Sequence, residues 1–183
     1  MKFGDLFSDR PMGTIVRLGA IAVAAALCAC TADRVEPPSE PTFYRSLAEP
    51  GAQVDAGAAA SMLSGYRTNN GLSVVTIDPE LMKLAEAQAQ AMAGRDKLDH
   101  NVIRGFTERL AAGGYHARTA AENIGAGYHT LAEAFSGWRD SPPHRANMLL
   151  KGATRIGIAT AYAPKSKYKV FWALILAQPD GPG

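Results

Sequence analysis

The chain has 183 residues, of which 47% are hydrophobic and 20% are charged, and its formal net charge is +2. These values are typical of one ordinary soluble globular domain with additional segments. They argue against a strongly basic nucleic-acid-binding protein, and no dense cluster of lysine and arginine favours one. Composition predicts no particular chemistry, so the motifs must supply it.

The N-terminal segment has the pattern of an export signal. Basic residues precede an apolar run over 18–27, which is too short to span a bilayer because a transmembrane helix needs about 20 apolar residues. The basic residues are Lys2, Arg10 and Arg17. The segment ahead of the apolar run is long and carries acids, so Met12 is an alternative start to Met1.

Both cysteines follow this run, in the order Leu27, Cys28, Ala29, Cys30. The pattern resembles the lipobox of bacterial lipoproteins, in which the cysteine after a small residue is acylated. We therefore expect residues 1–29 to be a lipoprotein signal peptide and Cys30 to be the lipidated residue that anchors the protein to a membrane. The alternative is an ordinary secretory signal with two incidental cysteines. In either case the mature domain has no internal disulfide and depends on its core.

A proline-rich segment over residues 30–55 is typical of an extended tether. It contains Pro37, Pro38, Pro41 and Pro50, carries charges of both signs and shows little periodicity. Such a tether would hold a folded domain away from a membrane. The folded domain is then expected over residues 56–180.

Apolar periodicity predicts a helix over 58–67 and a second helix that begins after Asp78. In the first helix, Ala58, Met62 and Tyr66 share one face. In the second, Asp78 is suited to be the N-cap and the proline that follows it fits the first turn. An Asn-Gly turn signal separates the two helices.

Two further helices and two strands complete the predicted domain. A short helix is expected over 105–112, and a capping box of Thr130 and Glu133 marks the start of the fourth helix. Residues 155–163 alternate like one face of a strand, whereas 168–177 is apolar on both faces and is expected to be a central strand. Helices followed by an antiparallel hairpin indicate an α+β domain with helices packed on a sheet.

Several motifs occur in an order that resembles a known family. They are MAGRDKLDH, AENIGAG, WRDSPPHRANML and, in the two strands, IGIATAY and FWALILAQ. Together they resemble the bacterial branch of the CAP superfamily, the SCP-like extracellular domain also found in cysteine-rich secretory proteins, antigen 5 and plant pathogenesis-related 1 proteins. The resemblance runs from about Ser61 to Gln178. It implies an α-β-α sandwich, with a central antiparallel sheet between helical layers, and a cleft that holds two histidines and acidic residues.

The resemblance assigns three cleft residues in this chain. His100 matches the first cleft histidine, Glu122 the first acid and His144 the second histidine. Two imidazoles and a carboxylate are good ligands for a divalent cation such as Zn²⁺, with His100 and His144 as the metal ligands. The same residues are compatible with a general-base pair in which Glu122 orients one imidazole, or with a hydrogen-bonded brace around the cleft.

The chain departs from the family pattern beside His144. Many eukaryotic relatives carry a second acid three residues after the tryptophan that matches Trp138, whereas this chain has Ser141. Asp140 is adjacent but points about 100° away on a helix, and Glu133 already belongs to its capping box. The usual SPGHR is also SPPHR here, which excludes a positive φ at the second proline. The incomplete acid set weakens both the metal and the catalytic interpretation.

Other polar residues of these motifs are expected to support the loops. Asn123 is expected to bond backbone in the loop after Glu122, and Arg145 and Asn147 to tie the HRANML turn to neighbouring carbonyls or to an acid. Ser141 as N-cap, with a proline at the first helical position, would hold His144 on a short rigid shoulder. No serine has a G-x-S-x-G context, which argues against a serine hydrolase.

The sequence therefore predicts a lipid-anchored protein of the bacterial cell envelope that faces outside the cytoplasm. Its cleft is expected to bind a small ligand, lipid-like or from the cell wall, or a divalent cation. The alternative is a hydrolase of peptide or cell-wall substrates that uses the same residues to activate water. A third interpretation leaves the cleft without a ligand and assigns the exposed surface to a protein partner. Binding is favoured over catalysis because no activated nucleophile is visible, and no nucleic-acid partner is expected.

Overall fold

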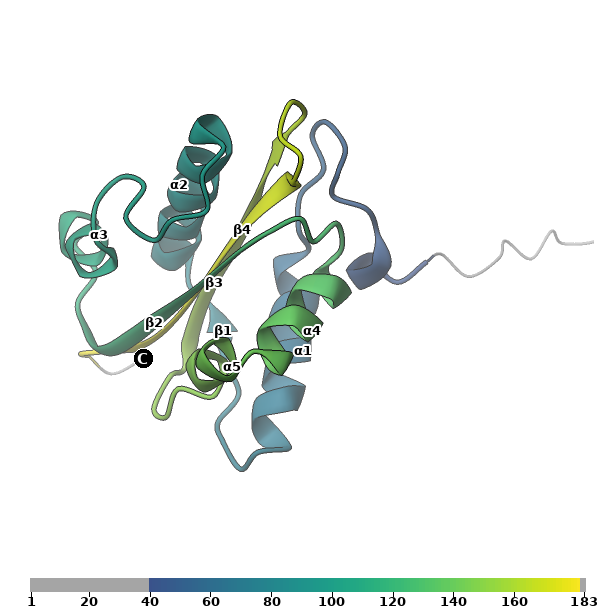
Figure 1. Ribbon diagram of the computed structural model, residues 1–183. Coiled ribbons are helices and arrows are strands. Elements are labelled where there is room, and N and C mark those ends of the chain that lie inside the picture. Colours follow the sequence, from purple (N-terminus) through teal and green to yellow (C-terminus); the bar gives the residue numbers. More distant parts are fainter. Residues whose placement is uncertain (1–39, 182–183) are drawn as a thin grey trace, which may run out of the picture. The chain divides into compact units, whose positions relative to one another are not determined.

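The structure is a computed structural model that describes residues 40–181 (Figure 1). The expected signal peptide, Cys30 and the first part of the tether lie outside the described residues. Among the helices of the described part, none combines the length and the apolar character that a bilayer crossing requires.

A four-stranded sheet forms the centre of the domain, in the order β1-β3-β4-β2. The strands are β1 (Thr76–Ile77), β2 (Ala117–Ala126), β3 (Arg155–Ala163) and β4 (Lys169–Pro179). β4 pairs antiparallel with both β2 and β3, whereas β1 pairs parallel with the start of β3. The expected α+β class and the central position of the last strand are confirmed. The sheet is mixed rather than purely antiparallel because of β1.

Helices cover both faces of this sheet, as the ribbon shows (Figure 1). One face carries α2 (Pro79–Arg95) and α3 (Phe106–Ala112). The other carries three helices, which are α1 (Ala56–Thr68), α4 (Leu131–Asp140) and α5 (Pro142–Met148). The layers form the α-β-α sandwich that the family resemblance implies.

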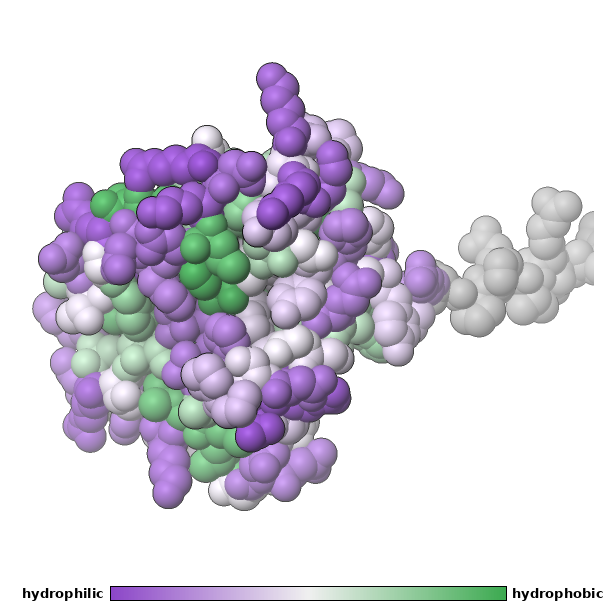
Figure 2. Space-filling view, viewed as in Figure 1, coloured by the Kyte–Doolittle hydropathy of each residue, from purple (hydrophilic) through white to green (hydrophobic). Residues whose placement is uncertain are grey.

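The residues of β4 fill the hydrophobic cores on both sides of the sheet. Trp172 and Leu176 pack toward α1 and α4, while Phe171 and Ile175 pack toward α2, and all four are fully buried. Successive side chains of a strand point to opposite faces, so an uninterrupted apolar run can line two cores at once. The outer surface is largely hydrophilic in the view of Figure 2, with smaller hydrophobic areas between.

Local capping signals fix where two helices begin. The Asp78 carboxylate accepts hydrogen bonds from the backbone N–H groups of Glu80 (2.9 Å) and Leu81 (3.1 Å). The side chains of Thr130 and Glu133 bond each other's backbone N–H groups, which is the predicted capping box. These groups satisfy N–H donors that the first turn of a helix leaves without partners.

The buried face of α1 is shifted by one residue from the prediction. Ala59, Leu63 and Arg67 are buried, whereas the predicted face of Ala58, Met62 and Tyr66 is only partly buried. The shift arises because the guanidinium of Arg67 points into the protein, where it finds hydrogen-bond acceptors. A sequence pattern that counts arginine as a solvent-facing residue cannot find this face.

The described part of the expected tether packs against the domain. Leu47 is buried in the core on the α1 side, and its backbone N–H donates to the carbonyl of His129 (2.7 Å). A short 3₁₀ helix, η1 (Thr42–Tyr44), precedes it, and Asp55 caps α1 through the backbone N–H of Ala58 (2.9 Å). Folded structure therefore begins before residue 56, because an apolar side chain within the proline-rich segment finds a place in the core.

Candidate functional site

The three predicted cleft residues lie at the edge strand β2, one within it and two in segments that bond to it. Glu122 belongs to β2 itself. His100 lies in the connection between α2 and α3, and His144 is in the first turn of α5. Segments far apart in the sequence are thus brought to one strand edge.

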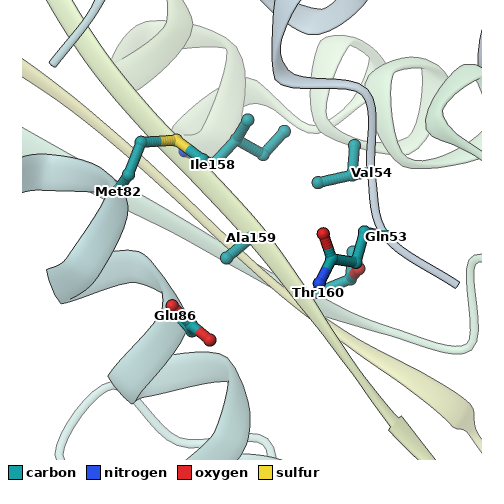
Figure 3. A pocket seen from close by; sticks show the side chains of 7 residues that line it. All are labelled: Gln53, Val54, Met82, Glu86, Ile158, Ala159 and Thr160. Carbon is teal, nitrogen blue, oxygen red and sulfur yellow. The ribbon is translucent and has the colours of Figure 1, made fainter. Parts of the chain in front are cut away.

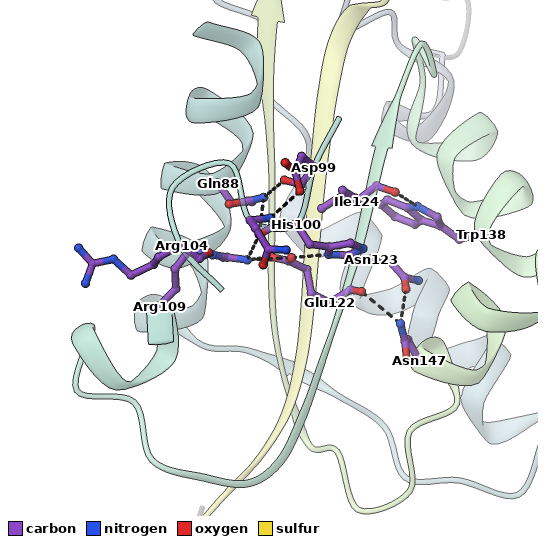
Figure 4. Close-up of polar contacts among 11 residues, drawn as sticks. Gln88, Asp99, His100, Arg104, Arg109, Glu122, Asn123, Ile124, Trp138 and Asn147 are labelled. Carbon is purple, nitrogen blue, oxygen red and sulfur yellow. Dashed lines mark hydrogen bonds and ion pairs between the residues drawn. The ribbon is translucent and has the colours of Figure 1, made fainter. Parts of the chain in front are cut away.

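Glu122 is held by an arginine that the sequence analysis missed. Its side chain is only 1% exposed, and its two oxygens accept from Nη2 of Arg109 at 2.8 and 2.7 Å (Figure 4). Arg109 comes from α3 and is itself buried. The two opposite charges form a hydrogen-bonded pair, which is how a carboxylate can be removed from water.

His100 is the second partner of Glu122. Its Nδ1 lies 2.8 Å from Oε1 of Glu122, and its side chain is 47% exposed. A carboxylate can only accept a hydrogen bond, so Nδ1 carries the hydrogen that is donated. In the neutral ring the Nε2 atom then has a free lone pair. Glu122 therefore sets both the orientation and the tautomer of His100.

Gln88 and Arg109 support the backbone that carries His100. The Nε2 atom of Gln88, a fully buried residue of α2, donates to the carbonyls of Asp99 (2.9 Å) and His100 (3.4 Å). Nη2 of Arg109 also reaches the carbonyl of His100 (3.3 Å). Gln88 was not predicted as a site residue either, although a glutamine within the apolar stripe of α2 is a detectable signal.

Two asparagines fasten α5 to β2 and so position His144. Nδ2 of Asn123 donates to the carbonyl of His144 (3.0 Å), and Nδ2 of Asn147 donates to the carbonyl of Glu122 (3.1 Å) and to Oδ1 of Asn123 (2.9 Å). Consecutive residues of β2 thus hold the two histidines, since Glu122 holds the ring of His100 and Asn123 holds the backbone of His144. Asn123 lies in β2 and bonds the backbone of α5, rather than backbone in a loop after Glu122 as predicted.

The ring of His144 is held by Ser141, the residue that stands where many relatives have an acid. Nδ1 of His144 lies 2.9 Å from Oγ of Ser141. Ser141 is the N-cap residue of α5, but its hydroxyl makes no capping bond. Burial lowers the pKa of His144, and the charge of His100 lowers it further.

The remaining polar candidates lie outside this arrangement. Arg145 is exposed, and within the described part of the chain its guanidinium reaches only the carbonyl of Arg139, at 3.5 Å. Asp140 pairs with Arg139 at the surface (2.8 Å), and Glu133 is engaged in its capping box. The family pattern has a second acid at the position of Ser141. Neither Asp140 nor Glu133 replaces it in this structure.

Glu122 is poorly placed to be a ligand of a metal ion in this site. Both carboxylate oxygens are already bonded, and water does not reach them. Within residues 40–181, no group of three or more histidine, cysteine, aspartate or glutamate side chains is placed to hold a metal ion. Among the described residues, neither histidine makes a hydrogen bond through Nε2, so these two atoms are left without a protein partner.

His144 should titrate below the ordinary histidine pKa of 6.5, and the His100→Ala variant should raise its pKa toward that value. The unfolded chain binds this proton at a higher pH than the folded chain, so the contribution of His144 to stability decreases as the pH falls below about 6.5. A proton NMR titration of the ring measures both midpoints. An unchanged midpoint in the variant would contradict a site shared by the two rings.

Comparisons with known proteins agree with this architecture. A sequence model of the cysteine-rich secretory protein (CAP) family matches residues 60–176, well over half of the chain. The uncharacterised protein YkwD of Bacillus subtilis is 28% identical over 130 residues, which cover 70% of this chain and 51% of that protein. The chain thus spans about half the length of this relative.

Solved structures share the fold at low sequence identity. An extracellular protein of Bacillus anthracis with an SCP domain is 21% identical, with a TM-score of 0.58 over 67% of this chain and 39% of that one. An outer surface protein of Borrelia burgdorferi is 17% identical, with a TM-score of 0.60 over 71% of this chain and 99% of that one. The matched family model includes His100, Glu122 and His144 as well as most of the sheet and helices, and the chain therefore belongs to the cysteine-rich secretory protein (CAP) family.

Proposed function

We propose that this domain is an extracytoplasmic binding module, in which the Nε2 atoms of His100 and His144 recognise a polar fragment of the cell wall. One observation carries the proposal. Each ring has its Nδ1 atom held by a protein side chain, Glu122 in one case and Ser141 in the other. Both imidazoles are thereby fixed in orientation, and Nε2 is left to face a ligand.

The same observation favours binding over hydrolysis. A general base must reach the water from which it takes a proton. The carboxylate of Glu122 is buried and bonded by Arg109 and His100, so it acts as a positioning group for His100. Ser141 occupies the position of the second acid in the family pattern. Within the described residues no other carboxylate joins the two histidines to act as the base.

The chemistry of the site favours a ligand rich in hydroxyl and amide groups. Asn123 is fully buried and both asparagines are engaged between β2 and α5, so the two imidazoles supply the groups that remain for a ligand. A neutral imidazole offers one donor or one acceptor at Nε2, which suits the groups of sugars and peptides. A divalent cation bound by the two Nε2 atoms is the second candidate, because both are imidazole nitrogens that such ions accept. With only two protein ligands, we expect that binding to be weak.

Export and anchoring at Cys30 form part of the proposal. The lipobox pattern and the proline-rich segment would place the domain outside the cytoplasm, attached to a membrane and close to cell-wall material. The secretory character of the family supports this location.

The test uses a defined mixture of muropeptides as probe, with ZnCl₂ in a separate titration. NMR signals of the His100 and His144 rings should shift together on addition of muropeptides. Affinity should fall at least tenfold in His100→Ala and in His144→Ala. The matched control is His116→Ala, which removes an exposed histidine outside the site and should leave affinity unchanged.

Three results would overturn the proposal. Neither ring signal shifts with muropeptides, or binding survives both substitutions in the site. Alternatively, mass spectrometry detects cleavage of the muropeptides by the wild type, and the cleavage disappears in Glu122→Gln. That last result would establish the hydrolase alternative.

A further inference from the structure

The edge of the sheet opposite the histidine site has backbone groups without partners. β1 covers only the start of β3, because Thr76 and Ile77 pair with Arg155 and Ile156. From Ile158 onward, no strand of the described chain pairs with the outer side of β3.

The register identifies the groups that point outward. The backbone N–H of Gly127 donates to the carbonyl of Val170, so even-numbered residues of β4 bond β2 and odd-numbered ones bond β3. Ala161 is the register partner of Phe171, so the backbone groups of Thr160 and Tyr162 point away from β4. The N–H of Ile158 also points outward, and it donates to Sδ of Met82 (3.2 Å).

The two edges of the sheet differ in how they are protected. On the β2 edge, the carbonyls of Glu122 and Ile124 accept from the side chains of Asn147 (3.1 Å) and Trp138 (3.1 Å). On the β3 edge, no side chain within residues 40–181 bonds the outward groups of Thr160 and Tyr162. These groups form a ready template for another strand.

A groove with two walls encloses this free edge. Met82 and Glu86 of α2 stand on one side of β3, and Gln53 and Val54 stand on the other, around a cavity of about 120 Å³ (Figure 3). A second hollow of about 490 Å³ is lined by later residues of the same two elements. They are Gln90, Ala93 and Gly94 from α2 and 161–163 from β3, together with Asp96 after α2 and residues 164–166 after β3. The α2 wall therefore continues along the later part of the edge, whereas Gln53 and Val54 line only the part around Thr160.

The close contact between α2 and the sheet explains why one wall stands so near the edge. Gly157 lies under α2, where a Cβ atom would overlap the backbone of Leu81 and Met82. The absence of a side chain lets the helix pack directly on β3. The helix then presents Met82, Glu86 and Gln90 along the groove, at the spacing of successive turns.

We propose that the β3 edge binds an extended segment of a partner protein, which adds a strand to the sheet through the backbone groups of Thr160 and Tyr162. Two of the charged side chains that line the two hollows are acidic, Glu86 and Asp96, and one is basic, Lys165, which favours a segment with a basic residue over a second copy of the same acidic edge. The segment would cover about five residues, from Ile158 to Tyr162. The carboxylate of Glu86, which accepts from Gln90 (2.9 Å), would favour a lysine or arginine in the segment.

The experiment selects peptides from a random hexapeptide library against the full domain and measures their affinity for designed variants. Thr160→Pro removes the outward N–H, and an edge strand tolerates proline where that group faces away from its neighbour. Thr160→Val keeps the N–H and is the matched control. Selected peptides should carry a basic residue, bind at least tenfold more weakly to Thr160→Pro and to Glu86→Gln, and bind Thr160→Val with unchanged affinity.

Amide hydrogen exchange gives a readout that does not depend on the proline variant folding. In the wild type, bound peptide should slow exchange at Thr160 and Tyr162 at least tenfold. The His100→Ala and His144→Ala variants should bind the same peptides unchanged, which separates this inference from the proposed function. It is overturned if no peptide is selected, if peptides bind Glu86→Gln and a folded Thr160→Pro as tightly as the wild type, or if exchange slows elsewhere but not at these two amides.

Discussion

Replacement of Arg67 by methionine should lower the free energy of unfolding by about 3 kcal/mol. The Arg67 guanidinium is fully buried and donates to four backbone carbonyls. They are Ser73 (2.9 Å), Met148 (2.9 Å), Leu150 (3.0 Å) and Ala153 (2.8 Å). Methionine has a similar length but no donor, so these carbonyls lose their partner at once.

The cost of burying a charge works against this effect but does not reverse it. Burial lowers the pKa of Arg67, which reflects the loss of hydration that the guanidinium undergoes. The four hydrogen bonds offset that loss, and each buried carbonyl left without a donor costs about 1 kcal/mol or more. The single residue joins α1 to the end of α5 and to the chain that leads into β3.

Thermal unfolding followed by circular dichroism measures the effect. The midpoint should fall by on the order of 10 °C for a domain of this size. The matched control is Arg118→Met, because Arg118 is exposed on β2, and it should change the midpoint little. Equal shifts for the two variants would show that the Arg67 bonds contribute nothing specific.

Replacement of Arg109 by methionine should lower the free energy of unfolding by about 3–5 kcal/mol. The side chains of Arg109 and Glu122 are 5% and 1% exposed, so the variant leaves a carboxylate in the protein interior without its charged partner. The decrease in the free energy of unfolding exceeds that for a surface pair because water cannot solvate the charge that remains on Glu122.

A double-mutant cycle separates the pair from its surroundings. Combining Arg109→Met with Glu122→Gln should cost less than the sum of the two single changes, because the double variant buries no unpaired charge. The exposed pair of Arg139 and Asp140 is the control, and Arg139→Met should cost less than about 1 kcal/mol. Strict additivity at Arg109 and Glu122 would contradict the account of a buried pair.

Features decided by neighbours in the sequence could be predicted. Asp78 and the pair of Thr130 and Glu133 cap helices through residues two to four positions away, and the apolar run in β4 identifies a strand with two covered faces. Such signals are local, so one sequence is enough to find them.

Features decided by distant partners could not be predicted. Arg67 bonds the carbonyls of residues 81 to 86 positions away, and nothing near it in the chain indicates burial. β2 was not expected either, since its sequence carries polar and small residues where a core strand would carry branched apolar ones. It forms because β4 offers a pairing edge and Arg109 neutralises Glu122.

The candidate site shows the same division. The three residues His100, Glu122 and His144 came from the family resemblance, which carries the three-dimensional arrangement of relatives. The supporting residues Arg109 and Gln88 could not be assigned from that resemblance. Their partners, Glu122 and the carbonyl of Asp99, lie close to them only in the folded protein.

The central claim is that Glu122 fixes the tautomer of His100 and thereby turns Nε2 toward a ligand. A two-bond ¹H–¹⁵N spectrum at about pH 8 reports which ring nitrogen of a neutral histidine carries the hydrogen. The hydrogen of His100 should lie on Nδ1 in the wild type and should redistribute toward Nε2 in Glu122→Gln. A wild-type ring with its hydrogen on Nε2 would contradict the arrangement from which the proposed function follows.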